Sequence, residues 1–280
     1  KTNFFVKHLK SINIFINNLL EKNLNRLNVN NYRILLRNNK IILTFVAFFV
    51  LFISYLLIPN FYNQIEISKE LKGEISEKYN LNISFTEKLD YSFFPRPYFE
   101  TKKSTISDST GEISKIKTLK IYVSLNNLFS LKNIDVKDLT LENANFNLNK
   151  KNYNFFFKIL DNNFSERKLT IKNANIFFKN KDNEVLFINK ILNLKYFYDP
   201  NELKNIIKSK NEVFNLPYTI ELFKNDKKSI FSRTNFSFLK LQIENIFTYK
   251  NNVKVGSAYF IFNKNKSKGT YQIKNNSFQY

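Results

Sequence analysis

The chain has 280 residues, a net charge of +21 and 43% hydrophobic residues, so it is long enough for a sizeable core beside a membrane anchor. It contains no cysteine, which excludes disulfides, thiolate metal ligands and cysteine nucleophiles. Lysine supplies almost all of the positive charge, and with abundant asparagine, isoleucine and phenylalanine it indicates an AT-rich coding sequence. Because arginine, the usual residue for bidentate phosphate and base contacts, is rare, we expect no nucleic-acid partner.

Residues 1–40 form a basic leader. Its apolar residues recur three and four apart over residues 1–37, which is typical of an amphipathic helix, and the opposite face carries lysines and His8. The many asparagines weaken helix propensity, so a helix lying on a membrane surface and a partly disordered leader are equal alternatives. The chain has no methionine and begins with Lys1, and we expect it to be part of a longer protein that continues beyond Tyr280.

Residues 41–58 are an uncharged run of eighteen, IILTFVAFFVLFISYLLI. A helix of this length is about 27 Å long, close to the hydrocarbon thickness of a bilayer. A buried core helix is normally shorter and has a polar face. A cleaved signal peptide would lack the forty preceding residues and would be followed by a small-residue cleavage site. The run therefore predicts a single transmembrane helix that stays in the mature protein.

The basic residues on the two sides of this run predict its orientation. Residues 22–40 carry five of them, and residues 59–75 carry only Lys69 and Lys72. Because the more basic flank stays in the cytoplasm, we expect everything after Pro59 to lie outside it. The five basic residues of the leader are Lys22, Arg26, Arg33, Arg37 and Lys40.

Residues 59–80 predict a short juxtamembrane helix, since Ile67, Leu71 and Ile75 share a helix face over residues 65–79. From residue 81 to 280 the hydrophobic period changes to two, which predicts a β-rich domain. A short helix is expected at 201–209, after Asp199-Pro200. Strands are expected at 81–85, 89–93, 119–125, 186–191, 218–222, 236–243 and 253–262.

A ten-residue segment recurs thirty positions later: LTLENANFNL at 139–148 and LTIKNANIFF at 169–178. In each copy the apolar positions change from odd to even at the Asn-Ala pair. One extra residue that reverses the facing of a strand is typical of a β-bulge. Repeated strands with the same bulge predict a stacked, elongated antiparallel sheet, either curled into a groove or open as a sandwich.

In their order, these features resemble the amino-terminal part of the AsmA-like family over residues 41–178. The resemblance rests on the single span and short helix, followed by a strand that ends in a P-x-P segment, Phe93-Phe94-Pro95-Arg96-Pro97-Tyr98-Phe99. An amphipathic strand then enters a hydrophobic turn at 119–131, and the run I-x-V-x-x-L-x-L-x-N-A-x-F-x-L follows at 134–148.

The resemblance implies a β-rich periplasmic domain, anchored in the inner membrane of a Gram-negative bacterium. It further implies a role in outer-membrane biogenesis, with phospholipid transport along a hydrophobic β groove. Alternating strands rich in phenylalanine suit such a groove, and they suit a closed domain that docks an envelope protein equally well.

The sequence offers no catalytic, cofactor-binding or metal-binding residues. Only four glycines occur, and neither a phosphate loop nor a nucleophile elbow is found. The carboxylate pair Glu87 and Asp90 lies on a polar strand edge and is interpreted as solvated. We therefore expect no enzyme and no cofactor; the expected partners are the membrane, phospholipid and envelope proteins.

Overall fold

The structure is a computed structural model that describes residues 40–109, 111–126, 128–160, 167–224, 229–250, 253–274 and 277–279. The predictions for the leader at 1–39 lie outside the described residues. The chain divides into two compact units, Lys1–Tyr55 and Leu56–Tyr280. The second unit contains the whole β-sheet.

The apolar run forms helix α3, Lys40–Leu57, which continues into the 3₁₀ turn η1, Ile58–Phe61. Within the described part of the chain, this is the one segment that is long and apolar enough to cross a membrane, over Leu43–Phe61. Only 11% of the span is buried against the protein, so its apolar side chains face outward nearly all round, as expected for an anchor.

Helix α4, Gln64–Tyr79, confirms the predicted juxtamembrane helix. Asn63 caps it, because its side-chain oxygen accepts a hydrogen bond from the Ile65 N–H at 2.9 Å. The helix ends at Asn80, whose left-handed backbone (φ 53°) is a common C-terminal stop. Four residues at helical spacing form its buried face: Ile67, Leu71, Ile75 and Tyr79.

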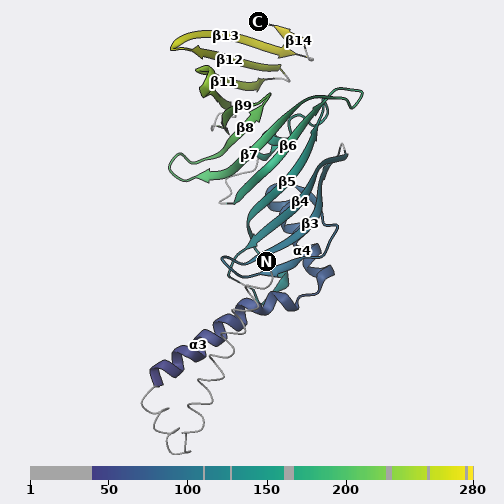
Figure 1. The fold of residues 1–280 in the computed structure, drawn as a ribbon, viewed down its shortest axis with the longest axis vertical. Helices are drawn as coiled ribbons and strands as arrows, with labels where there is room; N and C mark the ends of the chain where they lie inside the picture. Colours follow the sequence, from purple (N-terminus) through teal and green to yellow (C-terminus); the bar gives the residue numbers. More distant parts are fainter. Residues whose placement is uncertain are drawn as a thin grey trace, which may run out of the picture. The chain divides into compact units, whose positions relative to one another are not determined.

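The rest of the unit is a single fourteen-stranded sheet, so the predicted β-rich class is confirmed (Figure 1). Thirteen strands follow the order β1-β3-β4 and onward to β14, and β2 pairs with β3 outside this path. The strands are β1 (Asn82–Ser84), β2 (Asp90–Ser92), β3 (Tyr98–Asp108), β4 (Gly111–Val123), β5 (Val136–Leu148), β6 (Lys168–Lys179), β7 (Val185–Asp199), β8 (Lys204–Val213), β9 (Leu216–Lys224), β10 (Ile230–Phe236), β11 (Leu241–Lys250), β12 (Val253–Phe262), β13 (Asn265–Lys274) and β14 (Ser277–Gln279).

The two copies of the repeat are the neighbouring strands β5 and β6, which pair in parallel with Leu139 opposite Leu169. All other pairs are antiparallel, so the sheet is mixed where an antiparallel one was expected. Parallel neighbours need a crossover, and the connection between β5 and β6 contains the short helix α5, Phe155–Leu160, which the sequence pattern did not predict.

The predicted reversal of facing occurs in both copies. Asn143 and Asn173 have left-handed backbones (φ 55° and 51°), and buried positions pass from odd to even numbers there. Lys103 in β3 has the same backbone (φ 53°). Farther along the sheet, the pairing of β7 with β8 shifts between Ile191 and Asn193, because β7 accommodates one extra residue there.

Two predicted elements are wrong. The helix expected at 201–209 is a turn followed by β8: the Asp199 carboxylate accepts a hydrogen bond from the Asn201 N–H at 2.9 Å, and the ladder begins at Lys204. The strand expected at 236–243 is interrupted by the 3₁₀ turn η3, Ser237–Leu239, and by Lys240 with φ 51°. Its two ends therefore pair with each other as the strands β10 and β11.

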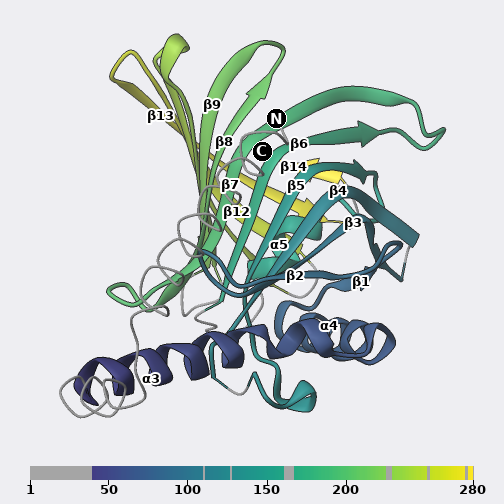
Figure 2. The ribbon, with the colours of Figure 1, turned by 60° about the horizontal axis from the view of Figure 1, so that its bottom comes forward.

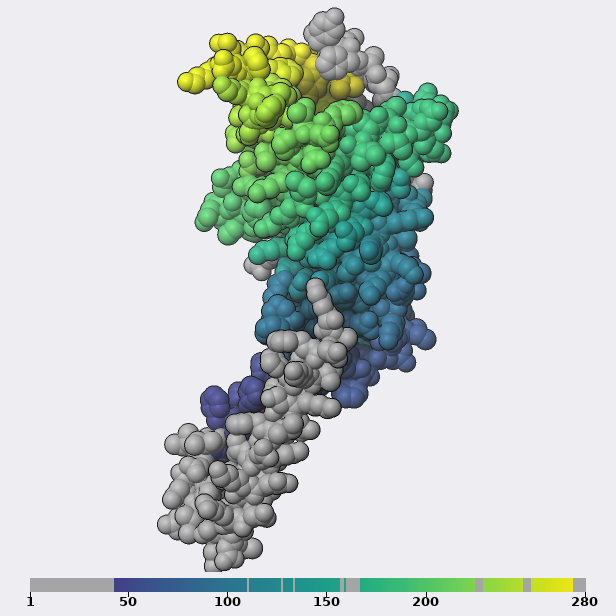
Figure 3. Space-filling model, in the orientation of Figure 1, coloured from purple at the N-terminus to yellow at the C-terminus, as the bar shows by residue number. Residues whose placement is uncertain are grey.

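The cross-strand register divides the side chains between two faces. We call the face on which α4 and α5 pack the inner face, and the opposite one the outer face (Figure 2). Phe146 of β5, for example, points to the inner face and meets Phe155 of α5 with ring centroids 5.8 Å apart. From β3 to β14 each strand pairs with the next one along the chain, and the sequence colours of Figure 3 accordingly change in order through the β unit.

Candidate functional site

The inner face of β3–β8 is a closed core. A row of apolar side chains crosses it in register and is almost fully buried beneath α4 and α5. Its central members are Leu119, Leu141, Ile171 and Leu194. This part of the face is therefore unavailable to a ligand, and it fixes the strands that continue into the rest of the sheet.

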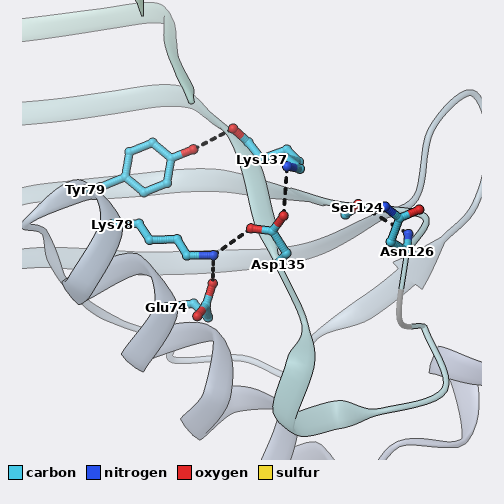
Figure 4. Close-up of polar contacts among 7 residues, drawn as sticks. All are labelled: Glu74, Lys78, Tyr79, Ser124, Asn126, Asp135 and Lys137. Atoms are coloured by element: carbon cyan, nitrogen blue, oxygen red, sulfur yellow. Dashed lines mark hydrogen bonds and ion pairs between the residues drawn. The ribbon is translucent and has the colours of Figure 1, made fainter. Parts of the chain in front are cut away.

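A polar cluster fixes α4 to the start of β5 (Figure 4). The Lys78 ammonium lies 2.6 Å from the Asp135 carboxylate and is also paired with Glu74, and Lys137 lies 2.9 Å from the other Asp135 oxygen. The Tyr79 hydroxyl donates to the Lys137 carbonyl at 2.8 Å. Although burial alone would raise the pKa of Asp135, the hydrogen bonds from Lys137 and Lys78 leave its pKa lowered.

Beyond β8 the inner face is uncovered. Its apolar side chains continue the same rows, but no element among the described residues packs on them, and most are half-buried or exposed. Phe260 and Phe262, for example, expose 47% and 59% of their surface. We call this surface the open face; its half-buried or exposed apolar members are Leu216, Tyr218, Ile220, Leu222, Phe236, Leu241, Ile243, Phe260 and Phe262, and the buried Phe247 lies at its margin.

Polar groups along the open face bond to one another. The Tyr218 hydroxyl donates to the Asn189 side-chain oxygen at 2.8 Å, and the Tyr271 hydroxyl donates to that of Asn245 at 2.8 Å. Burial raises the pKa of Tyr218 to about 12, so the phenol is neutral at ordinary pH. Shielding this surface from water would therefore cost little for these polar groups, because they keep their hydrogen bonds to one another.

A glycine makes room for one of these pairs. A Cβ at Gly256 of β12 would lie 2.5 Å from the end of the Tyr271 ring, so the ring lies directly over the glycine. The absence of a side chain at 256 thus lets Tyr271 of β13 reach Asn245 of β11 across the intervening strand.

Lys254 is a cation at the margin of the open face. Its ammonium lies 3.9 Å from the centroid of the Phe247 ring, and its side chain is half-buried. Desolvation lowers its pKa. Lys254 forms no ion pair with a described residue, so its charge is available to an anionic group placed beside the apolar surface.

The outer face of the same strands carries a row of paired charges. Lys208, Glu221, Arg233 and Glu244 lie directly opposite one another on four successive strands, with nitrogen–oxygen distances of 3.3, 3.6 and 3.0 Å. Each charge is paired with its neighbour, which makes this a solvated ladder. Apolar residues of the outer face, among them Phe223, Phe231 and Ile246, lie beside this ladder. On the inner face, no described element covers the apolar side chains from β9 to β12.

Glu87 and Asp90, the carboxylate pair of the sequence analysis, are each paired with a different lysine. Glu87 lies 2.9 Å from Lys103, and Asp90 lies 3.7 Å from Lys88. In the described ranges, His, Asp and Glu side chains nowhere gather in threes as metal ligands would. The alternating apolar residues of β9–β12 indicated that one face of these strands is apolar. Only the structure shows that no described element packs over that face.

These features define a class of protein: a long β-sheet with an open apolar face, in a chain whose described residues include one candidate membrane-spanning helix. The model of the AsmA family matches residues 36–254, and the chain belongs to this family. A search of curated proteins finds no significant match.

Proposed function

We propose that this protein is anchored in the bacterial inner membrane with its β domain in the periplasm, and that it acts in outer-membrane biogenesis by holding phospholipid on the open face. Membership of the AsmA family supports a role in envelope assembly. The domain limits that follow are a leader at 1–40, a span at 41–58, a juxtamembrane helix at 59–80 and the β domain from 81 onward.

The uncovered inner face of β9–β12 carries the proposal. Aromatic and branched side chains from all four strands lie on it, between smaller and polar residues such as Ser232, Thr234 and Asn245, and its tyrosines are neutral and hydrogen-bonded. Such a surface in water is costly unless an apolar partner occupies it. Acyl chains meet this need over the length of several strands, and Lys254 offers a cation for a phosphate headgroup.

Photo-crosslinking tests the occupant. In the full chain expressed in cells, Phe260→p-benzoylphenylalanine should crosslink to phospholipid, which mass spectrometry would identify. Tyr259 is its neighbour in β12 and faces the other side of the sheet, so Tyr259→p-benzoylphenylalanine is the matched control. Equal lipid labelling at the two positions, or none at 260, would contradict the proposal.

The alternative is an interaction protein that docks an envelope partner. One observation favours it: β14 pairs only with the end of β13, at Gln272–Lys274, so on the side away from β12 the described strands leave the stretch from Asn265 to Gly269 without a neighbour. Such an edge can accept a further strand. Protein adducts in place of lipid adducts at Phe260 would favour this alternative.

A further inference from the structure

The exposed apolar side chains of the first half of the β unit are confined to one region. Between Leu56 and Leu148, the large hydrophobic side chains that are exposed among the described residues all belong to three segments. These segments are the stretch from η1 into α4, the β2–β3 turn and the β4–β5 connection. We call the six residues the collar: Phe61, Ile65, Phe93, Phe94, Leu125 and Phe129.

The three segments meet where α3 ends. The Tyr91 hydroxyl, at the entrance to the β2–β3 turn, donates to the carbonyl of Leu56 at 2.8 Å. The Tyr62 hydroxyl, next to Phe61, donates to the carbonyl of Leu128 in the β4–β5 connection. Leu56 lies in the last turn of α3, so these bonds hold parts of the chain that are distant in sequence at the end of the span.

Buried side chains and hydrogen bonds hold these segments in place, so the exposure of the collar residues is a property of the fold. Pro59 and Leu128 are buried, while Phe61 and Phe129, close by in sequence, expose 87% and 72% of their surface. The Gln64 side chain also bonds to both the N–H and the carbonyl of Leu89, each at 3.1 Å. The first and third segments thus each bury one apolar side chain and present another outward.

Cations flank the collar. Lys69 and Lys72 of α4 and Lys88 before β2 line one shallow pocket together with Ile65 of the collar. The carboxylate in the same pocket, Glu87, is already paired with Lys103 at 2.9 Å. Lys88 is itself paired with Asp90 at 3.7 Å. Lys69 and Lys72, close to the exposed Ile65, complement an anionic lipid surface, where each is worth roughly 1 kcal/mol.

We propose that the collar is a membrane-binding surface, which inserts into the headgroup–acyl boundary of the leaflet from which α3 emerges. Aromatic rings favour this boundary, and the lysines lie beside them at headgroup level. The proposal rests on α3 crossing the bilayer, but it depends neither on which side of the membrane the domain occupies nor on any ligand of the open face.

The chain contains no tryptophan, so a single substitution gives a site-specific fluorescent probe in the full-length protein. We would place Phe94→Trp or Phe129→Trp in nanodiscs with anionic lipid, and measure the emission maximum and the quenching by lipids brominated near the headgroup end of the acyl chain. Phe48→Trp in α3 shows whether the anchor helix lies in the bilayer. Phe238→Trp in η3 is the matched control, since Phe238 is also an exposed phenylalanine in a turn.

The collar predicts blue-shifted emission and at least a twofold loss of intensity with brominated lipid for the probes at 94 and 129, and neither effect for the probe at 238. Quenching at 48 alone would overturn the collar and leave the anchor intact. Equal quenching at 238 would overturn it in favour of another docking face. A lack of quenching at all four positions would remove both the anchor and the collar. A protein partner in place of lipid predicts that the probes at 94 and 129 are not quenched in these nanodiscs while the probe at 48 is, and this result also overturns the proposal.

Discussion

Asp135 illustrates how one residue joins two elements of this fold. Its carboxylate accepts from Lys78 of α4 and from Lys137 of β5, at 2.6 and 2.9 Å. Because the pKa of Asp135 is lowered in the folded state, the charged form stabilises the protein. The interaction therefore ties the helix that covers the inner face to the strand beneath it.

Asp135→Asn should lower the free energy of unfolding by about 1 kcal/mol at pH 7, because both lysines lose a charged partner. The stabilising effect of Asp135 is present above its unfolded pKa, about 3.9, and is lost as the pH falls through the lower folded value. The difference between wild type and variant should thus shrink as the pH falls below the unfolded pKa, and disappear once Asp135 is protonated in the folded state as well. Urea unfolding of the full chain in nanodiscs, followed by circular dichroism, measures it.

Asp90→Asn is the matched control for this prediction. Asp90 is also paired with a lysine, but at 3.7 Å and with both side chains more than two-thirds exposed. Its loss should change the stability by no more than a few tenths of a kcal/mol. A larger loss at Asp90 than at Asp135 would show that the cluster of Figure 4 does not hold α4 in place.

At the scale of elements, the left-handed asparagines explain how neighbouring strands reverse their facing together. Asn143 and Asn173 occupy equivalent positions of the parallel pair, with φ of 55° and 51°. Asparagine tolerates this backbone better than other residues with a Cβ, apart from aspartate. The reversal lets Leu141 and Ala144, three residues apart, both face the core.

Asn143→Ala should therefore destabilise the protein by about 1 kcal/mol, while Asn143→Gly should have little effect because glycine adopts positive φ without strain. The same order should hold at Asn173. Unfolding midpoints of the four variants in the full chain provide the measurement. If the alanine and glycine variants are equally destabilised, the asparagine side chain itself matters, and the backbone explanation fails.

The sequence was informative wherever a local period decided the structure. It predicted α4, the alternating strands and the reversal at the two Asn-Ala pairs, because each follows from the spacing of apolar residues and from turn chemistry. It failed at 201–209, where a helix was expected after Asp199-Pro200, although that pair begins a turn and Ile206 and Ile207 then lie on opposite sides of β8. The parallel pairing of β5 with β6 depends on the path of the crossover, which no local pattern encodes.

At the scale of the whole β unit, the length of its helices explains why part of the sheet is open. A helix of sixteen residues is about 24 Å long, and α5 adds only six residues. Neighbouring strands lie about 4.8 Å apart, so the sheet from β3 to β13 is roughly 48 Å wide. The two helices therefore cover at most about two-thirds of the inner face, and the strands farthest along the chain from α4 are left bare. Whether a strand is covered thus depends on which described elements lie over it, and the strand pattern alone did not predict this.

The orientation of the span is a prediction for the molecule as a whole. Five basic residues precede the apolar run in residues 22–40, against Lys69 and Lys72 in the segment that follows. Because the positively charged flank is retained in the cytoplasm, protease added to spheroplasts should digest the region after Pro59 and spare the leader. Replacing the five leader residues Lys22, Arg26, Arg33, Arg37 and Lys40 with glutamine should yield a mixture of orientations, since the bias then favours the other flank. Digestion of the wild-type leader, or release of the chain by carbonate, would contradict both the anchor and the periplasmic location of the open face.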